Sequence, residues 1–242
     1  MLKQVRGIDH AVILVRDLDR ARETYARMGF TLTPRGFHSL GSQNHCLMFG
    51  KDYLELMALP AAPPAAFRYF AEFLAKREGV GALALATGDA AAAHAEMMQA
   101  GIATEAPLAL SRPVENLGEA RFTLVQLAPD ETPGFRSFVC QHHTRDIVWR
   151  PEYQRHANGV AGIISVSIAS ADPARYARLL DGIPVKHARA DAPSIAAIRL
   201  QVNDKKAAAD SLKRGGFSFV ALKDDTLVVP ADEAHGVMLV FG

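Results

Sequence analysis

Residues 7–30 of the chain read GIDHAVILVRDLDRARETYARMGF. The first nine residues are mostly apolar, which predicts a buried strand. Asp17 follows, and its carboxylate can accept hydrogen bonds from the free N–H groups that start a helix. The amphipathic pattern then predicts a helix that ends at Gly29, because glycine tolerates the left-handed conformation found after many helices. This stretch is therefore a strand–turn–helix unit.

The same pattern of strand, Asp, helix and Gly returns three times, at residues 79–102, 159–183 and 194–217. An internal repeat of this kind predicts a fold built from similar modules. Strand-like segments follow the first, second and fourth units at 31–36, 43–49, 53–59, 104–110, 121–127, 136–141, 217–222, 226–229 and 237–241.

Each of these three units is therefore predicted to be a βαβββ module. The third unit is shorter: 34 residues separate Gly182 from Gly216, whereas 72 separate Gly29 from Gly101. It has room for little more than βαβ and is expected to be degenerate. We predict an α+β fold in which paired βαβββ modules form cupped mixed sheets.

The breaks between modules indicate the domain boundaries. Residues 60–64 form a stiff Pro-rich break that leads to an expected short helix over 65–77. We expect a first domain of two modules at 1–142, a linker at 143–158 and a second, partly degenerate domain at 159–242. We expect the linker to be solvated. The alternative is that four of its side chains form an anion-binding lid: Arg145, Trp149, Arg150 and Arg155.

Four such units, with His10 in the first strand and GKDYLEL at residues 50–56, resemble the vicinal oxygen chelate superfamily, and above all its glyoxalase-like proteins. The resemblance covers most of 5–142, and 159–242 as topology only. It implies a metal inside the cup, with one ligand from the first strand and one from the fourth strand of each unit. By position the first unit supplies His10 and Glu55. In the second unit Gly81 matches the histidine, and the fourth-strand position falls near Cys140 to His142.

The first-unit pair also stands out on physical grounds. Glu55 lies in the apolar run Tyr53–Met57, where a carboxylate is costly unless a positive group meets it. Because side chains alternate along strands, His10 shares a face with Ile8 and Val12, and Glu55 shares one with Tyr53. A divalent metal held by both would resolve the cost. The alternative to metal binding is that His10 is a histidine of the hydrophobic core and that Glu55 is neutral or paired with an arginine.

Further candidates flank this pair. At most one of His142 and His143 can enter the cup, and His142 is the proposed third ligand, because two histidines and one carboxylate suit Fe(II), with Mn, Ni and Zn as alternatives. Either Asn44 or His45 is expected to face the pocket and contact substrate, and Tyr53 can offer a hydroxyl. Cys46 and Cys140 are expected to be buried, inert thiols.

Composition narrows the class of protein. Hydrophobic residues make up 49% of the 242 residues, charged residues make up 22% and the net charge is +1. These values are typical of a globular protein and give no reason to expect a nucleic-acid or membrane partner. The two cysteines and the absence of a signal-like or membrane-spanning run favour the cytoplasm. A homodimer is a possible assembly.

The sequence therefore predicts a metal-dependent glyoxalase-like enzyme, an isomerase or lyase, that acts on a small substrate with two neighbouring oxygens. Glu55 would ligate the metal or act as a base. A non-catalytic binder of small molecules or drugs is the alternative, favoured by the missing ligand at Gly81. A weaker alternative is an extradiol-type dioxygenase.

Overall fold

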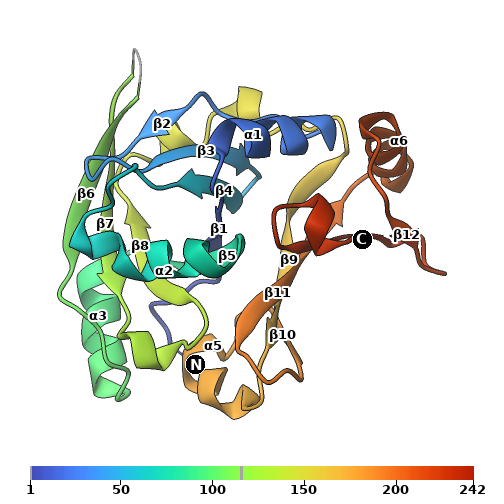
Figure 1. Cartoon of the computed structure of the whole chain (residues 1–242). Coiled ribbons are helices and arrows are strands. Elements are labelled where there is room, and N and C mark those ends of the chain that lie inside the picture. Colours follow the sequence, from blue (N-terminus) through green and yellow to red (C-terminus); the bar gives the residue numbers. More distant parts are fainter. Residues whose placement is uncertain (1, 115–116) are drawn as a thin grey trace.

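The computed structural model describes residues 2–114 and 117–242. Within them the chain has an α+β architecture, in which 14 strands join in one branched mixed sheet and short helices cover it (Figure 1). Three units have the predicted βαβββ form, and in each of them the first strand pairs in parallel with the fourth.

The first module comprises β1 (Ile8–Leu14), α1 (Leu18–Arg27), β2 (Gly36–Phe37), β3 (Gln43–Met48) and β4 (Tyr53–Ala58). The 3-10 helix η1 (Ala65–Phe67) and α2 (Arg68–Lys76) follow the Pro-rich break, where a short helix was predicted. The second module comprises β5 (Gly79–Ala86), α3 (Ala90–Gln99), β6 (Leu108–Val114), β7 (Gly118–Gln126), η2 (Pro129–Glu131) and β8 (Arg136–His142).

Residues after β8 form α4 (Arg145–Val148) and η3 (Pro151–Tyr153). The third module comprises β9 (Val160–Ala169), η4 (Pro173–Tyr176), α5 (Ala177–Leu180) and β10 (Val185–Ala188). The fourth comprises β11 (Ser194–Val202), α6 (Lys205–Gly215), β12 (Val220–Ala221), β13 (Leu227–Val229), η5 (Ala231–Glu233) and β14 (Met238–Phe241).

The repeated Asp and Gly positions act as predicted. Asp17, Asp89 and Asp204 each accept a hydrogen bond from the backbone N–H three residues later. A glycine one or two residues after each repeated helix adopts positive φ, between +70° and +91°, at Gly29, Gly101, Gly182 and Gly216. Shared local chemistry thus sets the limits of each repeated helix.

The third module is degenerate, as predicted. Its short helix begins with the 3-10 turn η4, and Asp172 makes no side-chain capping bond there. Strand β10 pairs directly in parallel with β9, so the two middle strands of the repeat are missing. Two predicted strands are displaced: β2 covers Gly36–Phe37 rather than 31–36, and β6 covers Leu108–Val114 rather than 104–110. β6 pairs only with β7, and an edge strand tolerates Pro113 because its N–H side can be left unpaired.

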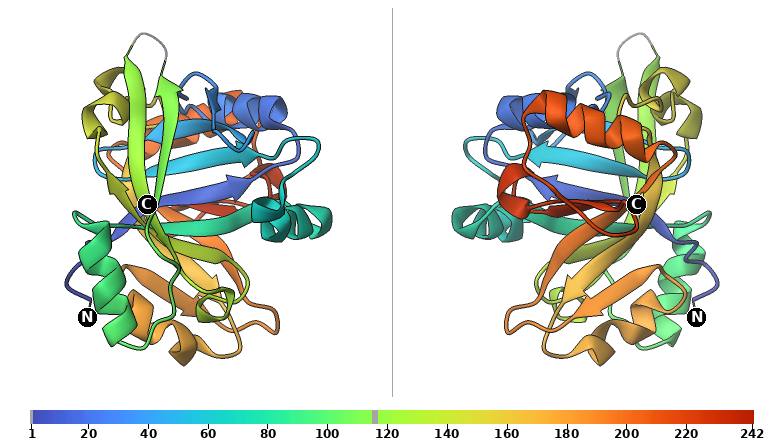
Figure 2. Two further views of the ribbon diagram at one scale, coloured as in Figure 1. Left: turned by 90° about the vertical axis from the view of Figure 1, so that its left-hand side faces the viewer. Right: turned by 90° about the vertical axis from the view of Figure 1, so that its right-hand side faces the viewer.

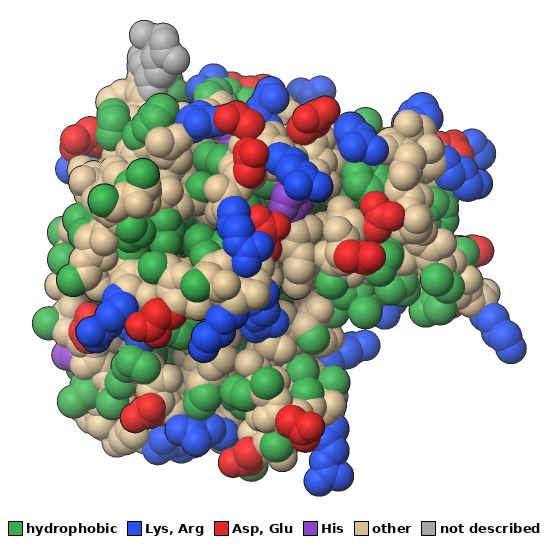
Figure 3. Space-filling model, in the orientation of Figure 1, with side chains coloured by type: hydrophobic (Ala, Val, Ile, Leu, Met, Phe, Trp, Pro, Cys, Tyr) green, Lys and Arg blue, Asp and Glu red, His purple; other side chains and the backbone are tan. Residues whose placement is uncertain are grey.

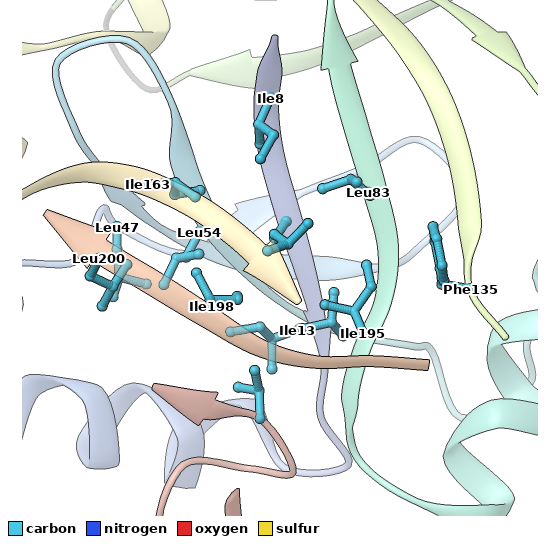
Figure 4. Close-up of a cluster of buried hydrophobic side chains, with 14 of the residues drawn as sticks. Ile8, Ile13, Leu47, Leu54, Leu83, Phe135, Ile163, Ile195, Ile198 and Leu200 are labelled. Atoms are coloured by element: carbon cyan, nitrogen blue, oxygen red, sulfur yellow. The ribbon is translucent and has the colours of Figure 1, made fainter. Parts of the chain in front are cut away.

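The two halves of the chain share one hydrophobic core. Strands β1 and β5 pair antiparallel in the first half, β9 and β11 do so in the second, and Ile195 of β11 meets Val80 of β5. Figure 4 shows Leu200 of β11 beside Leu47 of β3, and one core cluster contains both of them together with Ile198 of β11 and Ile13 of β1. Helix α6 also contacts α1 (Figure 2).

The segment 143–158 differs from the expected solvated linker. Trp149 is buried and packs edge-to-face against Tyr53 and His142. Further along, His156 accepts a hydrogen bond from the Thr31 backbone N–H and donates one to the carbonyl of residue 48. The segment is therefore part of the wall around the first half of the sheet.

The surface carries both signs of charge. The face in Figure 3 intersperses Lys and Arg with Asp and Glu, in keeping with the net charge of +1. Among the described residues, no helix is long and apolar enough to cross a membrane.

Candidate metal centre

Strands β1 and β4 bring the two predicted ligands together. Val12 lies opposite Glu55 in the parallel register, and His10 lies opposite Tyr53. The Nε2 atom of His10 lies 3.6 Å from Oε2 of Glu55, and both side chains are buried. The His10 ring also stacks on Tyr53, with 4.3 Å between the ring centroids. The predicted common face of His10 and Glu55 is thus present.

Asp9 belongs to the same cluster, although the sequence analysis did not select it. A β-bulge interrupts the pairing of β1 with β5 between Ile8 and His10. Ile8 therefore joins the main core instead of sharing the face of His10, contrary to the prediction from simple alternation. The Asp9 carboxylate accepts hydrogen bonds from Nδ1 of His10 at 2.6 Å and Nε2 of His142 at 3.0 Å.

The charge on Asp9 sets the direction of its hydrogen bonds with His10 and His142. Burial raises the pKa of the Asp9 carboxyl, but the hydrogen bonds from His10 and His142 outweigh it and hold that pKa well below its usual range. An ionised carboxylate only accepts, so His10 donates to Asp9 from Nδ1, and its Nε2 atom faces Glu55. Glu55 was selected because burying a carboxylate in an apolar run is energetically costly. The same argument could have identified Asp9.

The other oxygen of Glu55 faces β3. Asn44 donates a hydrogen bond to Oε1 of Glu55 at 2.6 Å, whereas His45 donates from Nδ1 to the Thr33 carbonyl at 2.8 Å. Adjacent side chains on a strand point to opposite faces, so Asn44 is the member of this pair that meets the site. Gly36 leaves the space for it, since a Cβ there would approach Oδ1 of Asn44 to 2.3 Å.

His142 lies on the far side of Asp9 from His10. Its ring packs edge-to-face against Phe122 and Trp149, and its Nδ1 has no hydrogen-bond partner among the described residues. His143, the next residue, contacts Thr123 at an exposed position instead. His142 is therefore the histidine of the pair that enters the cup. It is hydrogen-bonded to Asp9 rather than to Glu55.

The second module supplies no matching pair. Its strand β5 also has a bulge against β1, at Gly81, so Gly81 matches Asp9 and the next residue, Ala82, matches His10. The parallel register of β5 and β8 then places Phe138 at the position of Glu55. Gly81 has no room for a side chain, because its Cβ would lie 2.2 Å from Leu14. This half of the cup is apolar.

Helix α2 covers the apolar half. Phe73 packs with Val12, Leu14, Met57 and Ala82 in a separate hydrophobic cluster, with three other α2 side chains against it. The two best-defined surface hollows lie elsewhere, between α3 and α5 and on the outer side of the β6–β7 hairpin. The Asp9, His10 and Glu55 side chains are all buried.

These donors fit a divalent ion. Two ligand atoms about 2.1 Å from one ion at a tetrahedral angle lie about 3.4 Å apart, close to the separation of His10 and Glu55. Within the described residues one compact set exists, in which ligand atoms of Asp9, Cys140 and His142 all lie within 4.8 Å of one another. Cys140 and Cys46 are free and buried, and burial raises the pKa of both thiols, consistent with their expected inertness.

The cupped modules and the β1–β4 pair define a protein of the vicinal oxygen chelate class. The chain belongs to the glyoxalase-like domain family of that superfamily, whose family model matches residues 8–184. No curated protein sequence matches it.

Solved structures share the fold over most of the chain. A hypothetical protein from Staphylococcus aureus has a TM-score of 0.73 at 11% identity, covering 98% of both chains. A mutant of 4-hydroxymandelate synthase from Streptomyces coelicolor has a TM-score of 0.65 at 13% identity, covering 98% of this chain and 92% of that one. Homoprotocatechuate 2,3-dioxygenase from Arthrobacter globiformis has a TM-score of 0.58 at 14% identity, covering 99% and 80%. At these identities the similarity establishes the fold alone.

Proposed function

We propose that this chain is a metal-dependent enzyme, an isomerase or lyase, that acts on a small substrate with two neighbouring oxygens. The observation that carries the proposal is the buried Glu55 carboxylate, which faces Nε2 of His10 at 3.6 Å. Asp9 holds the Nδ1 proton of that imidazole. A carboxylate behind a histidine is the usual arrangement around histidine ligands of metals, since it orients the ring and raises its basicity.

The residues of the site have separable roles in this proposal. His10 and Glu55 hold the ion, which is Fe, Mn, Ni or Zn, and Asn44 keeps one Glu55 oxygen in place. A bound divalent ion would act as a Lewis acid toward the substrate oxygens. Asn44 and Tyr53 lie beside the pair and are the proposed substrate contacts, whereas His45 lies on the other face of β3.

Glu55 can also serve as a base. Its carboxylate is buried, and its ionic partners among the described residues are His10 and His38. Helix α2 excludes water from the site through its apolar side chains. The role of His142 as the third ligand stays a prediction. In the structure its Nε2–H donates a hydrogen bond to Asp9.

The first test is elemental analysis of the purified protein beside Glu55→Gln, with Glu72→Gln as the matched control at an exposed position. We expect about one ion per chain in the wild type and in the control, and a strong loss in Glu55→Gln with an unchanged circular dichroism spectrum. Acidification through the histidine range should release the ion, because imidazole ligates only when neutral. A wild type that binds no metal after reconstitution would refute the proposal.

A metal-independent binder of small molecules is the second candidate. It is favoured by Ala82 and Phe138, which leave the second half-site without ligands, and by the apolar cluster beneath α2. It predicts that apolar ligands raise the melting temperature equally with and without a chelator. Extradiol-type dioxygenase activity is a weaker third reading, and an absence of oxygen uptake across a panel of catechols would count against it.

A further inference from the structure

His38 approaches the candidate metal centre from the turn after β2. Its Nε2 lies 3.8 Å from Oε1 of Glu55, the oxygen opposite to the one that faces His10. The side chain keeps 28% of its surface exposed, so it forms the outer edge of the cluster. Backbone hydrogen bonds hold the turn, from the His38 N–H to the Ser42 carbonyl and from the Gly41 N–H to the His38 carbonyl.

The protonation of His38 follows from its partners. Asn44 donates from Nδ2 toward Nε2 of His38 at 3.4 Å, which assigns the lone pair to Nε2. The Nδ1–H then donates to the hydroxyl of the buried Ser42 at 2.8 Å. His10 shows the same arrangement, with Nδ1 held by Asp9 and Nε2 directed at Glu55. The Nε2 atoms of two imidazoles therefore face one carboxylate.

The competing third ligand, His142, is less well placed. Its Nε2–H is already donated to Asp9, and that same oxygen accepts the N–H of His10. Asp9, Cys140 and His142 form a more compact set of ligand atoms, and an ion held there is the competing arrangement that the experiment below distinguishes. At the Glu55 site an ion would replace the N–H that Asn44 donates to Nε2 of His38, and Asn44 would keep its hydrogen bond to Oε1 of Glu55.

We propose that His38 is the third protein ligand of the divalent ion held by His10 and Glu55. The inference rests on the proposed function, since it concerns the same ion. It assigns all three ligands to the first module, in place of the one ligand pair per module that the superfamily resemblance implies. Two histidines and a carboxylate leave open coordination positions for two substrate oxygens.

The test is the affinity of the protein for Co²⁺, measured by competition with a chelator and by the visible absorption of the bound ion. His38→Ala should weaken binding at least 100-fold and change the absorption spectrum. Ser42→Ala should weaken it by about 10- to 100-fold, because outer-shell partners typically contribute that much. His142→Ala should weaken it less than His38→Ala does, and the exposed control His187→Ala should stay within about 3-fold of wild type.

The outcomes separate the two proposals. Loss of binding in His10→Ala with full retention in His38→Ala would overturn the role of His38 and leave the proposed function standing. The same holds if His142→Ala loses the ion while His38→Ala keeps it. A wild type that binds no Co²⁺ would overturn both. Circular dichroism and the melting temperature of each variant show that it is folded.

Discussion

Replacing Asp52 with asparagine should stabilise the protein at neutral pH. Asp52 lies in the turn between β3 and β4 and is only 1% exposed, and its Oδ1 accepts a hydrogen bond from the Ile163 N–H of β9 at 2.9 Å. Burial raises the pKa of this carboxyl from 3.8 to about 6, and the Ile163 N–H and Lys51 offset only part of that effect. An asparagine keeps the acceptor oxygen and removes the charge.

The sign and size of this change in stability follow from the raised pKa of Asp52. Between pH 3.8 and about 6 the folded chain retains a proton that the unfolded chain has lost, so this group lowers stability as pH rises through that window. Each pKa unit corresponds to about 1.4 kcal/mol, so the full penalty above pH 6 is about 3 kcal/mol. The stability of Asp52→Asn relative to wild type should therefore increase by about 2.4 kcal/mol between pH 4 and pH 7, since part of the penalty is already present at pH 4.

Urea unfolding of both proteins at several pH values between 4 and 7.5 measures this difference directly. The buried histidines titrate in both proteins and cancel, and any packing effect of the amide adds a constant offset. Asp191→Asn, at an exposed position, reports the effect of removing one surface carboxylate. A relative stability that stays flat or declines as pH rises would refute the reasoning.

Three further substitutions test other parts of the structure. Gly36→Ala should displace Asn44, whose Oδ1 occupies the space of the new methyl group, and should lower metal affinity with little loss of secondary structure by circular dichroism. Asp9→Asn should weaken metal binding by about 10- to 100-fold in a competition titration, because the asparagine keeps an acceptor oxygen for His10 but removes the charge that raises the basicity of its imidazole. Tyr25→Phe should lower the free energy of unfolding by about 1 kcal/mol, since the hydroxyl donates to a backbone carbonyl of the second half. Unchanged titrations, or an unchanged urea midpoint for Tyr25→Phe, would contradict these expectations.

Local chemistry made much of the fold predictable. Asp17, Asp89 and Asp204 cap their helices as the repeat indicated, because an Asp side chain reaches N–H groups only three residues away. The degenerate third module followed from spacing alone. The common face of His10 and Glu55 followed from strand alternation, which depends on nothing beyond the neighbouring residues.

Contacts between distant segments were not predictable in this way. The bulge at Asp9 depends on the pairing of β1 with β5, and it moves Asp9 between two histidines that are far apart in sequence. Trp149 was assigned to a solvated linker, because a lone tryptophan in a polar segment carries no periodicity; it is buried by β4 and β8.

The sequence by itself determined the repeat, its helix limits, the short third module and the β1–β4 pair. Those features depend on residue spacing and on hydrogen bonds within a few residues. Only the tertiary structure decided that Asp9 orients His10, that Asn44 rather than His45 meets Glu55, and that His38 reaches the same carboxylate. The reason is that strand register and the shape of a turn place these side chains, and both arise when separate parts of the chain pack together.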